Sequence, residues 1–222
     1  IKAQESLHLV LGMDYQFYGW GRPFKFVIEV YYKNMKNLIP YDVDNVRIRY
    51  HGENSAKGYA MGIDLKINGE FVKGVDSWAS LSVMQTEENL ANDFYTYIDS
   101  LNQEITVYPG YIPRPSDQRI NFAIFFQDYL PRNPTYKMHL NLLFGSGLPF
   151  GPPNSDRYLA INRMPSYRRV DIGFSKEISG QKSNNTIIST YFKSIWLTAE
   201  IFNLLGVNNT ISHIWISDIR NR

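Results

Sequence analysis

The sequence contains no cysteine, so it cannot form a disulfide framework or a zinc site with thiolate ligands. No window approaches the ~18 uninterrupted apolar residues of a transmembrane helix, which excludes a helical membrane span. Residues 1–5 lack the apolar core of a signal peptide. The sequence also lacks a large excess of either charge, because 23 basic and 21 acidic residues leave a net charge of +2. Neither nucleic acid nor another strongly charged partner is therefore indicated.

Aromatic residues, in contrast, are abundant: 16 Tyr, 13 Phe and 4 Trp make up 15% of the chain. A soluble protein can place so many rings in its core or in a binding groove. A membrane β-barrel uses the same residues as girdles at the lipid headgroups. Composition leaves both classes open, so the order of the residues has to decide.

Alternation of apolar and polar residues with period two dominates the chain and predicts β-strands from one end to the other. In residues 24–32, for example, Phe26 and Ile28 fall on one face, while Lys25 and Glu29 fall on the other. Similar segments are residues 7–15, 59–67, 79–83, 120–126, 138–144, 170–174 and 195–201, with less certain ones at 46–50 and 211–216. Without a linker, a repeat or a long amphipathic helix, the chain is predicted to be one all-β unit of about nine antiparallel strands.

Turn-rich stretches separate the predicted strands, at residues 18–23, 68–74, 131–135, 147–165, 180–185 and 206–209. The longest connection, residues 86–118, is locally acidic and shows no clear alternation until its end. Several predicted strands run for about 10–12 residues, whereas globular strands are nearer 5–6. Eleven tilted residues rise about 28 Å, enough to cross the ~25 Å apolar band of an outer membrane. This favours a transmembrane β-barrel over a soluble sandwich or jelly roll.

A barrel of this kind would turn its apolar residues toward lipid and its charged residues toward a wet interior. The charged side chains expected on the wet side are Lys25, Glu29, Asp64, Arg169, Asp171 and Glu200. An arc of about nine strands would leave two unpaired edges, which are costly in lipid. We therefore expect that further strands, or another chain, close the sheet.

Four segments resemble stretches of Bacteroidetes-type TonB-dependent outer-membrane receptors. They are residues 53–62 (ENSAKGYAMG), 144–153 (FGSGLPFGPP), 163–172 (RMPSYRRVDI) and 200–206 (EIFNLLG). The segments follow the order found in that family, at plausible spacing, and together span most of the chain. On this resemblance, residues 1–222 are the C-terminal part of a barrel of about 22 strands, and the plug domain and closing strand are not in this chain.

The resemblance also implies a location and a function. The protein would lie in the bacterial outer membrane and import a scarce ligand by TonB-dependent transport. Siderophore, cobalamin-like, peptide and glycan ligands all stay open, because the C-terminal pattern of glycan importers is not seen. The implied partners are outer-membrane lipid and lipopolysaccharide, the remainder of the barrel and plug, and TonB through that plug, with no nucleic acid. A surface lipoprotein stays open as a further partner. Strand direction stays open, since loop length places residues 86–118 outside and family analogy near Asn203 places them inside.

Candidate site residues are few. The four histidines, His8, His51, His139 and His213, lie in separate segments without metal-ligand spacing, and are expected to be solvated or to face the barrel interior. Asp42, Asp44 and Asn45 lack the ligand spacing of a calcium loop, so a polar loop is expected. No Gly-x-Ser-x-Gly elbow and no phosphate-binding glycine loop occur. The sequence therefore predicts no catalytic, metal or cofactor-binding residues and no enzyme activity, and leaves the ligand-binding residues unknown.

One basic group could still have a role. Arg163, Arg168 and Arg169, with Arg157 nearby, could bind lipopolysaccharide phosphates or an anionic ligand, or could simply be a solvated strand end. Two rival functions remain beside transport. One is a soluble β-sandwich that stacks sugars on Tyr and Trp, and the other is an outer-membrane enzyme on a smaller barrel.

Overall fold

The computed structural model describes residues 1–44, 46–130, 132–152, 155–180, 192–213 and 216. Over these residues the protein is all-β, apart from one short 3-10 helix, and its strands pair antiparallel. The strands of the main sheet are β1 (Glu5–Gly19), β2 (Arg22–Leu38), β5 (Ala56–Val72), β6 (Val75–Leu90), β9 (Tyr111–Pro113), β10 (Ile120–Leu130), β11 (Asn133–Gly145), β14 (Tyr167–Ser179) and β15 (Ile195–Ile201). Among the described residues, no helix is both long enough and apolar enough to cross a bilayer.

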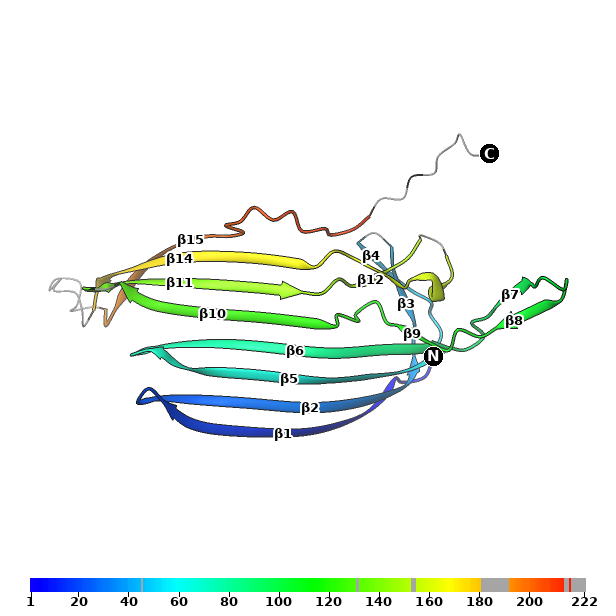
Figure 1. Cartoon of the computed structure of the whole chain (residues 1–222), viewed down its shortest axis with the longest axis horizontal. Coiled ribbons are helices and arrows are strands. Elements are labelled where there is room, and N and C mark those ends of the chain that lie inside the picture. The colour runs from blue at the N-terminus through cyan, green and yellow to red at the C-terminus, as the bar shows by residue number, and fades with distance from the viewer. Residues whose placement is uncertain (45, 131, 153–154, 181–191, 214–215, 217–222) are drawn as a thin grey trace.

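The main sheet has nine strands in the order β1-β2-β5-β6-β10-β11-β14-β15, and β9 pairs with the end of β6 (Figure 1). Strands adjacent in the sheet follow one another along the chain, apart from small hairpins in the connections. This up-and-down order is what alternating strands joined by turns are expected to give. The prediction of an antiparallel all-β fold is confirmed.

The register aligns residues of one kind across neighbouring strands. Leu11 lies opposite Val30, Val30 opposite Ile63, Ile63 opposite Val83, and Val83 opposite Ile120. Residues directly opposite each other point to the same face of a sheet. These apolar residues therefore form a row across β1, β2, β5, β6 and β10, and the facing pairs of β11, β14 and β15 continue it. We call this side of the sheet the apolar face.

The opposite side of the sheet, the polar face, is aligned in the same way. Glu29 lies opposite Asp64, Asp64 opposite Ser82, and Ser82 opposite Asn121. Lys25 precedes Glu29 by four residues and so shares its face, as the period-two rule requires. Through the pairing of β10, β11, β14 and β15, the register places Arg169, Asp171 and Glu200 on this face too. All six charged residues expected on one side of the strands therefore share one face.

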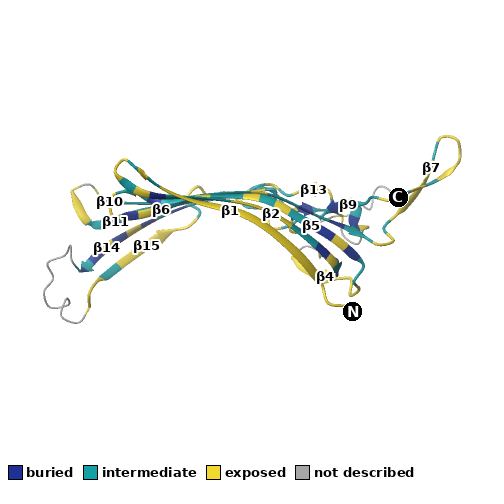
Figure 2. Ribbon diagram, turned by 90° about the horizontal axis from the view of Figure 1, so that it is seen from below, coloured by how far each residue is buried: buried dark blue, intermediate teal, exposed yellow. Residues whose placement is uncertain are grey.

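Exposure across the sheet is the reverse of that in a soluble domain. On the apolar face Leu11 is 79% exposed and Val30 is 45% exposed, whereas Asp171 on the polar face is only 2% exposed. The sheet is bowed along its strands, as the view in Figure 2 shows. In the part of the chain that the structure describes, the other sheets are two-stranded hairpins, and none of them covers the apolar face.

The two ends of the sheet differ in their connections. At one end, β1 and β2 are joined by a tight turn at Trp20 and Gly21, both with positive φ, and residues 73–74 join β5 to β6. Residues 131–132 join β10 to β11 there, and the longer segment 180–194 joins β14 to β15. At the other end lie three long connections, residues 39–55, 91–119 and 146–166. We call this second end the long-connection end.

Several strand ends differ from the predicted ones. β6 continues to Leu90, so residues 86–90, expected in a connection, belong to a strand. β2 and β5 each extend over 17 residues, and the turns predicted at residues 18–23 and 68–74 shrink to two residues each. The strand expected at residues 211–216 is wrong for 211–213, which are not in a strand, while 214–215 lie outside the described residues. Most of the turn expected at residues 180–185 also lies outside them.

Candidate functional site at the long-connection end

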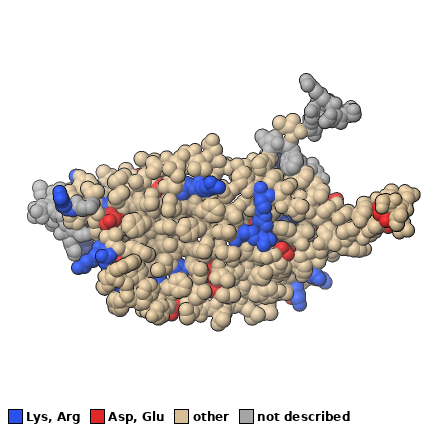
Figure 3. All heavy atoms as spheres, in the orientation of Figure 1, with Lys and Arg blue, Asp and Glu red and all other residues tan. Residues whose placement is uncertain are grey.

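The long connections carry small elements of their own. The connection after β2 forms a hairpin of β3 (Tyr41–Asp44) and β4 (Arg47–Tyr50). The connection after β6 forms a hairpin of β7 (Tyr95–Ile98) and β8 (Glu104–Val107), and the connection after β11 holds β12 (Pro149–Phe150), the 3-10 helix η1 (Arg157–Leu159) and β13 (Asn162–Arg163). On the face seen in Figure 3, Lys and Arg side chains lie at both ends of the molecule and between them, with Asp and Glu side chains interspersed.

Glu88, on β6, is a fully buried carboxylate that holds two arginines. Its Oε2 lies 3.2 Å from Nε of Arg114, and its Oε1 lies 3.4 Å from Nη2 of Arg157. The same Nη2 donates a hydrogen bond of 2.7 Å to the carbonyl oxygen of Pro113, and Nε of Arg157 lies 3.6 Å from Oδ1 of Asp42. Arg157 therefore joins η1 to β6, to β9 and to β3.

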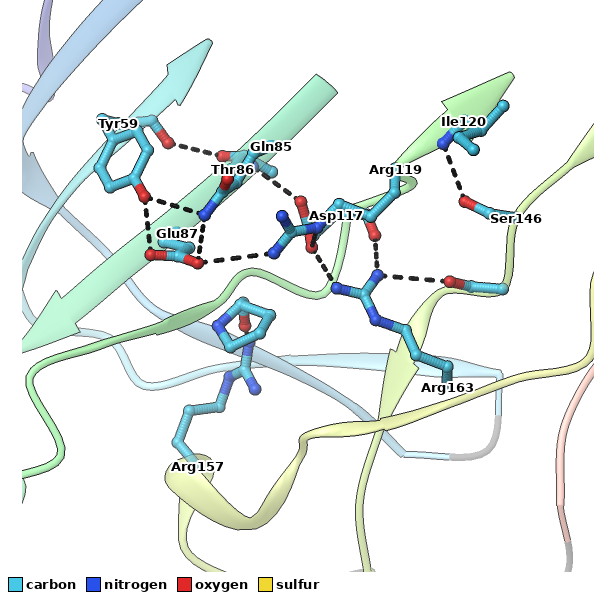
Figure 4. A network of polar contacts seen from close by, with 12 residues as sticks. Tyr59, Gln85, Thr86, Glu87, Asp117, Arg119, Ile120, Ser146, Arg157 and Arg163 are labelled. Carbon is cyan, nitrogen blue, oxygen red and sulfur yellow. Dashed lines mark hydrogen bonds and ion pairs between the residues drawn. The ribbon is translucent and has the colours of Figure 1, made fainter. Parts of the chain in front are cut away.

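Asp117 is the second fully buried carboxylate, and it organises the neighbouring contacts drawn in Figure 4. It accepts hydrogen bonds of 2.7 Å from the backbone N–H of Thr86 and from Nε of Arg119. The guanidinium of Arg163 binds both the side chain and the carbonyl oxygen of Asp117. Arg119 also reaches Glu87 at 3.5 Å. These bonds connect β13 to the segment that leads into β10.

Buried carboxylates that are paired and hydrogen-bonded on several sides hold their neighbours in one geometry, because leaving any of them unpaired is costly. Here the arginine partners come from two of the long connections, and Arg157 reaches the third through Asp42. The connections are thus fastened to one another and to the end of β6, apart from the β7–β8 hairpin, which projects from this end (Figure 1). The arginines of this network pair with carboxylates and backbone carbonyl oxygens, contacts that bind and position neighbouring segments.

A cavity of about 590 Å³ lies beside this network, between the three long connections and the segment after β15. Its size falls in the range of small-molecule sites, roughly 300–1,000 Å³. Its lining combines charged groups of both signs with apolar ones, including Asp42, Arg49, Phe150, Arg157, Met164 and His213. Such a lining can recognise a ligand by charge, hydrogen bonding and apolar contact together.

A second, shallower hollow of about 400 Å³ lies on the polar face at mid-strand. It is lined by Glu29, Asp64, Lys66 and Asn121 among others. Two acidic side chains here lie opposite each other on β2 and β5, with a lysine close by. The polar face therefore carries charged side chains away from the long connections as well as near them.

The basic group predicted from residues 157–169 does not act as one anion site. Arg157 pairs with Glu88, Arg163 pairs with Asp117, and Nη2 of Arg169 lies 2.9 Å from Asp171. Arg168 donates through Nε to the hydroxyl of Ser166 at 3.0 Å. Three of the four cations are thus paired with carboxylates. Arg168 and Arg169 are adjacent in β14, so they point to opposite faces of the sheet.

The four histidines also remain apart. His51 lies 2.8 Å from Asp42 and His139 lies 2.8 Å from Glu200, while His8 packs on Tyr31 and His213 stacks on Phe150. Within the described ranges, no group of three or more His, Asp or Glu residues could hold a metal ion. Asp42 is engaged by His51 and Arg157, and Asn45 lies outside those ranges.

Sequence reasoning missed Glu88 and Asp117. Glu88 belongs to a stretch that shows no alternation, and Asp117 lies in a connection. The one available signal was a set of arginines in the connections, of which Arg114 and Arg119 flank Asp117 and Arg157 follows Asp156. Nothing in the sequence assigns those partners to each other, since they come together only when the long connections fold over the end of β6.

The base of the β7–β8 hairpin contains a perturbed carboxyl group. Burial raises the pKa of Asp93, the nearby Asp156 raises it further, and the positive charge of Arg157 lowers it. The pKa of Tyr158 is raised as well, first by desolvation and then by Asp156. Negative charge is thus disfavoured at this point, where two connections meet.

Comparison with known proteins assigns no family, since no protein-family model and no curated protein matches the chain.

Proposed function

We propose that the chain is part of an outer-membrane β-barrel that imports a scarce ligand by TonB-dependent transport. The observation that carries the proposal is the exposed apolar face, formed by a register that places charged residues on the other side. Burying such a face requires either lipid or a second packed layer. A soluble sandwich needs that second layer, and the described sheet has none.

The dimensions of the apolar face support a membrane location. Along β1 it runs from Leu7 to Phe17, about 33 Å at ~3.3 Å per residue. With the strand tilt usual in barrels, near 40°, this rises about 25 Å, which matches the apolar band of an outer membrane. The face therefore has the height that lipid would cover.

Aromatic rings border the apolar face at both ends. Toward the short turns, Tyr15, Phe17 and Phe24 stack in series with ring centroids 5.8 and 5.5 Å apart. Toward the long-connection end, the ring centroids of Tyr59 and Tyr32 lie 6.3 Å apart, and the ring of Tyr59 contacts that of Tyr111 as well. Amphipathic rings at both borders of an apolar band are the arrangement by which barrels meet the headgroup layers.

The edges and ends of the sheet suggest how the rest is arranged. β1 and β15 each pair on one side within the described sheet, so a barrel would need further strands to pair with them. We propose that the remainder of the barrel and a plug supply these contacts, and that TonB acts through the plug. Outer-membrane barrels have short periplasmic turns and longer external loops, which puts the long-connection end outside the cell.

In this arrangement the cavity at the long-connection end is the place where a ligand is first bound. Its walls are held by Glu88, Asp117 and their arginines, so the site is formed before a ligand arrives. The polar face then provides a wet, charged path with no covalent chemistry. Siderophore, cobalamin-like, peptide and glycan ligands all remain compatible with a lining of mixed charge.

Uptake can be tested in the cells that make the protein. A strain lacking the gene and its parent are grown in defined rich medium, and the compounds left in the medium are measured by mass spectrometry. We expect at least one nutrient to remain in the medium of the deletion strain and also of the parent treated with a protonophore, because TonB draws on the proton gradient. Identical depletion by both strains would contradict the proposal.

A further inference from the structure

The segment that follows β15 continues along β14 toward the long-connection end (Figure 1). Its first part is held by several hydrogen bonds. The backbone N–H of Asn203 donates to Oδ1 of Asp171 at 2.9 Å. The backbone N–H of Leu204 donates to the carbonyl oxygen of Val170 at 2.7 Å, and the side chain of Asn203 makes two bonds of 3.1 Å with the backbone of Val207. These bonds fix the course of the segment along the edge of β14.

Asn209 makes the next anchor. Its Oδ1 accepts a hydrogen bond of 2.9 Å from the backbone N–H of Arg168, and its Nδ2 donates one of 2.8 Å to the carbonyl oxygen of Arg168. A side-chain amide offers one acceptor and two donors, so it can satisfy both backbone groups of a residue at a sheet edge. Asn209 therefore ties the segment to the start of β14, beside the connection of residues 146–166.

Residues 210–213, which we call the strap, form one wall of the cavity at the long-connection end. The ring of His213 stacks on that of Phe150 in β12, with centroids 4.6 Å apart and ring planes at 29°. In the part of the chain that the structure describes, no hydrogen bond or ion pair joins the strap to another segment, and Ile211 is 81% exposed. The strap is thus held at Asn209 on one side and by a ring contact on the other.

The walls of the cavity differ in how firmly they are held. Arg157 and the neighbouring connections are fixed by the buried carboxylates of Glu88 and Asp117. Local opening requires least free energy where few buried contacts and hydrogen bonds hold a segment, as in the strap. A stacked ring pair is a weak contact, since its loss changes an equilibrium by roughly 2- to 10-fold. The strap is therefore the wall that opens most easily.

We propose that the strap is a gate on the cavity, hinged at Asn209 and latched by the stacking of His213 on Phe150. Ile211 lines the cavity and is largely exposed, so a bound ligand with an apolar part would cover it and favour the closed position. The gate rests on the proposed role of the cavity as the ligand site. Its motion is measured without any ligand.

The absence of native cysteine lets one introduced thiol report on access to the cavity. Met164→Cys places that thiol in the cavity lining, and the whole protein is labelled with a small charged maleimide in membranes of the cells that make it. His213→Ala removes the latch, whereas His213→Phe keeps a ring that stacks. His8→Ala is the matched control, because His8 lies on β1 and packs on Tyr31 instead of lining the cavity.

We expect His213→Ala to raise the labelling rate of Met164→Cys roughly 2- to 10-fold, and His213→Phe and His8→Ala to leave it unchanged. Ala123→Cys, buried in β10, reports on unfolding and should label equally slowly in every variant. An unchanged rate in His213→Ala, an equal rise in His8→Ala or His213→Phe, or a matching rise at Ala123→Cys would each overturn the gate. These rates do not depend on uptake, so the gate and the transport proposal fail separately.

Discussion

The guanidinium of Arg157 and the carboxylate of Glu88 lie 3.4 Å apart, with 4% and 0% of their side chains exposed. One belongs to η1 and the other to the end of β6, 69 positions away in the sequence. A buried pair of this kind fixes two distant segments, because either charge left alone in the interior is strongly disfavoured. Arg157 lines the cavity at the long-connection end and Glu88 does not, so the wall of the cavity depends on a partner outside its lining.

Replacing Arg157 by Met should destabilise the long-connection end. The change leaves Glu88 with Arg114 as its remaining cation, and breaking a buried pair costs about 3–5 kcal/mol. Urea unfolding and limited proteolysis of residues 146–166 would measure the loss. Arg168→Met is the matched control, because Arg168 is exposed and bonded through Nε to a serine hydroxyl, and it should change stability by no more than about 0.5 kcal/mol. Equal effects of the two variants would contradict the role given to Arg157.

Gly62→Ala should destabilise the sheet far more than Gly12→Ala. A Cβ at position 62 would lie 2.6 Å from the hydroxyl oxygen of Tyr31 and 2.8 Å from the carbonyl oxygen of Val83, whereas at position 12 the nearest atom is Cγ of Glu29, at 3.2 Å. Overpacking of this kind costs about 1–3 kcal/mol. Midpoints of urea unfolding for the two variants would test the difference, and equal midpoints would show that the polar face is less crowded than described.

The base of the β7–β8 hairpin should loosen as pH rises. The pKa of Asp93 is raised by burial, so its folded-state value lies above its unfolded one. The stability it contributes is present below the unfolded pKa and is lost as pH rises through the raised folded pKa. Asp93→Asn should remove this pH dependence and slow hydrogen exchange of residues 91–111 at neutral pH. Faster hydrogen exchange in Asp93→Asn at neutral pH would show that the ionised Asp93 stabilises the hairpin base, and would contradict the raised pKa of this group.

Arginine should be tolerated on one face of β6 and not on the other. Val83 belongs to the apolar face and Ser82 to the polar face, at the middle of the same strand. If lipid covers the apolar face, Val83→Arg costs about 2–4 kcal/mol near the bilayer centre. Ser82→Arg places the same side chain near Asp64 and Glu29, where it should cost much less. The free energy of unfolding of each variant, measured in lipid vesicles, would show the difference. Equal losses of stability in the two variants would argue against lipid contact.

Most of the sheet could be predicted from the sequence, because alternation reports which residues share a face. Lys25 and Glu29 were assigned to the same side as Arg169 and Glu200, and the register confirms it. Turns rich in Gly and Asn gave the approximate strand limits. Residues 86–90 show no alternation, and yet β6 continues through them. Their side chains and backbone contact the long connections instead of facing lipid or water alone, so no period-two pattern is required there.

The candidate site was much less accessible to sequence reasoning. Arg163 and Arg169 looked like neighbours in one basic group, yet they bind Asp117 and Asp171 respectively. Partners that are 46 residues apart, such as Arg163 and Asp117, meet only through the folding of two connections, and no local pattern encodes that meeting. The register of neighbouring strands follows from periodicity, while contacts between loops do not.

The most direct test of the account compares Val30→Cys with Glu29→Cys, each labelled with a fluorescent maleimide in membranes of cells that make the protein. Both positions are exposed in the sheet, and they point to opposite faces. The account expects brominated lipid to quench the label at position 30 and a charged water-soluble maleimide to react at position 29 alone. Equal reaction at both positions without quenching by lipid would contradict it.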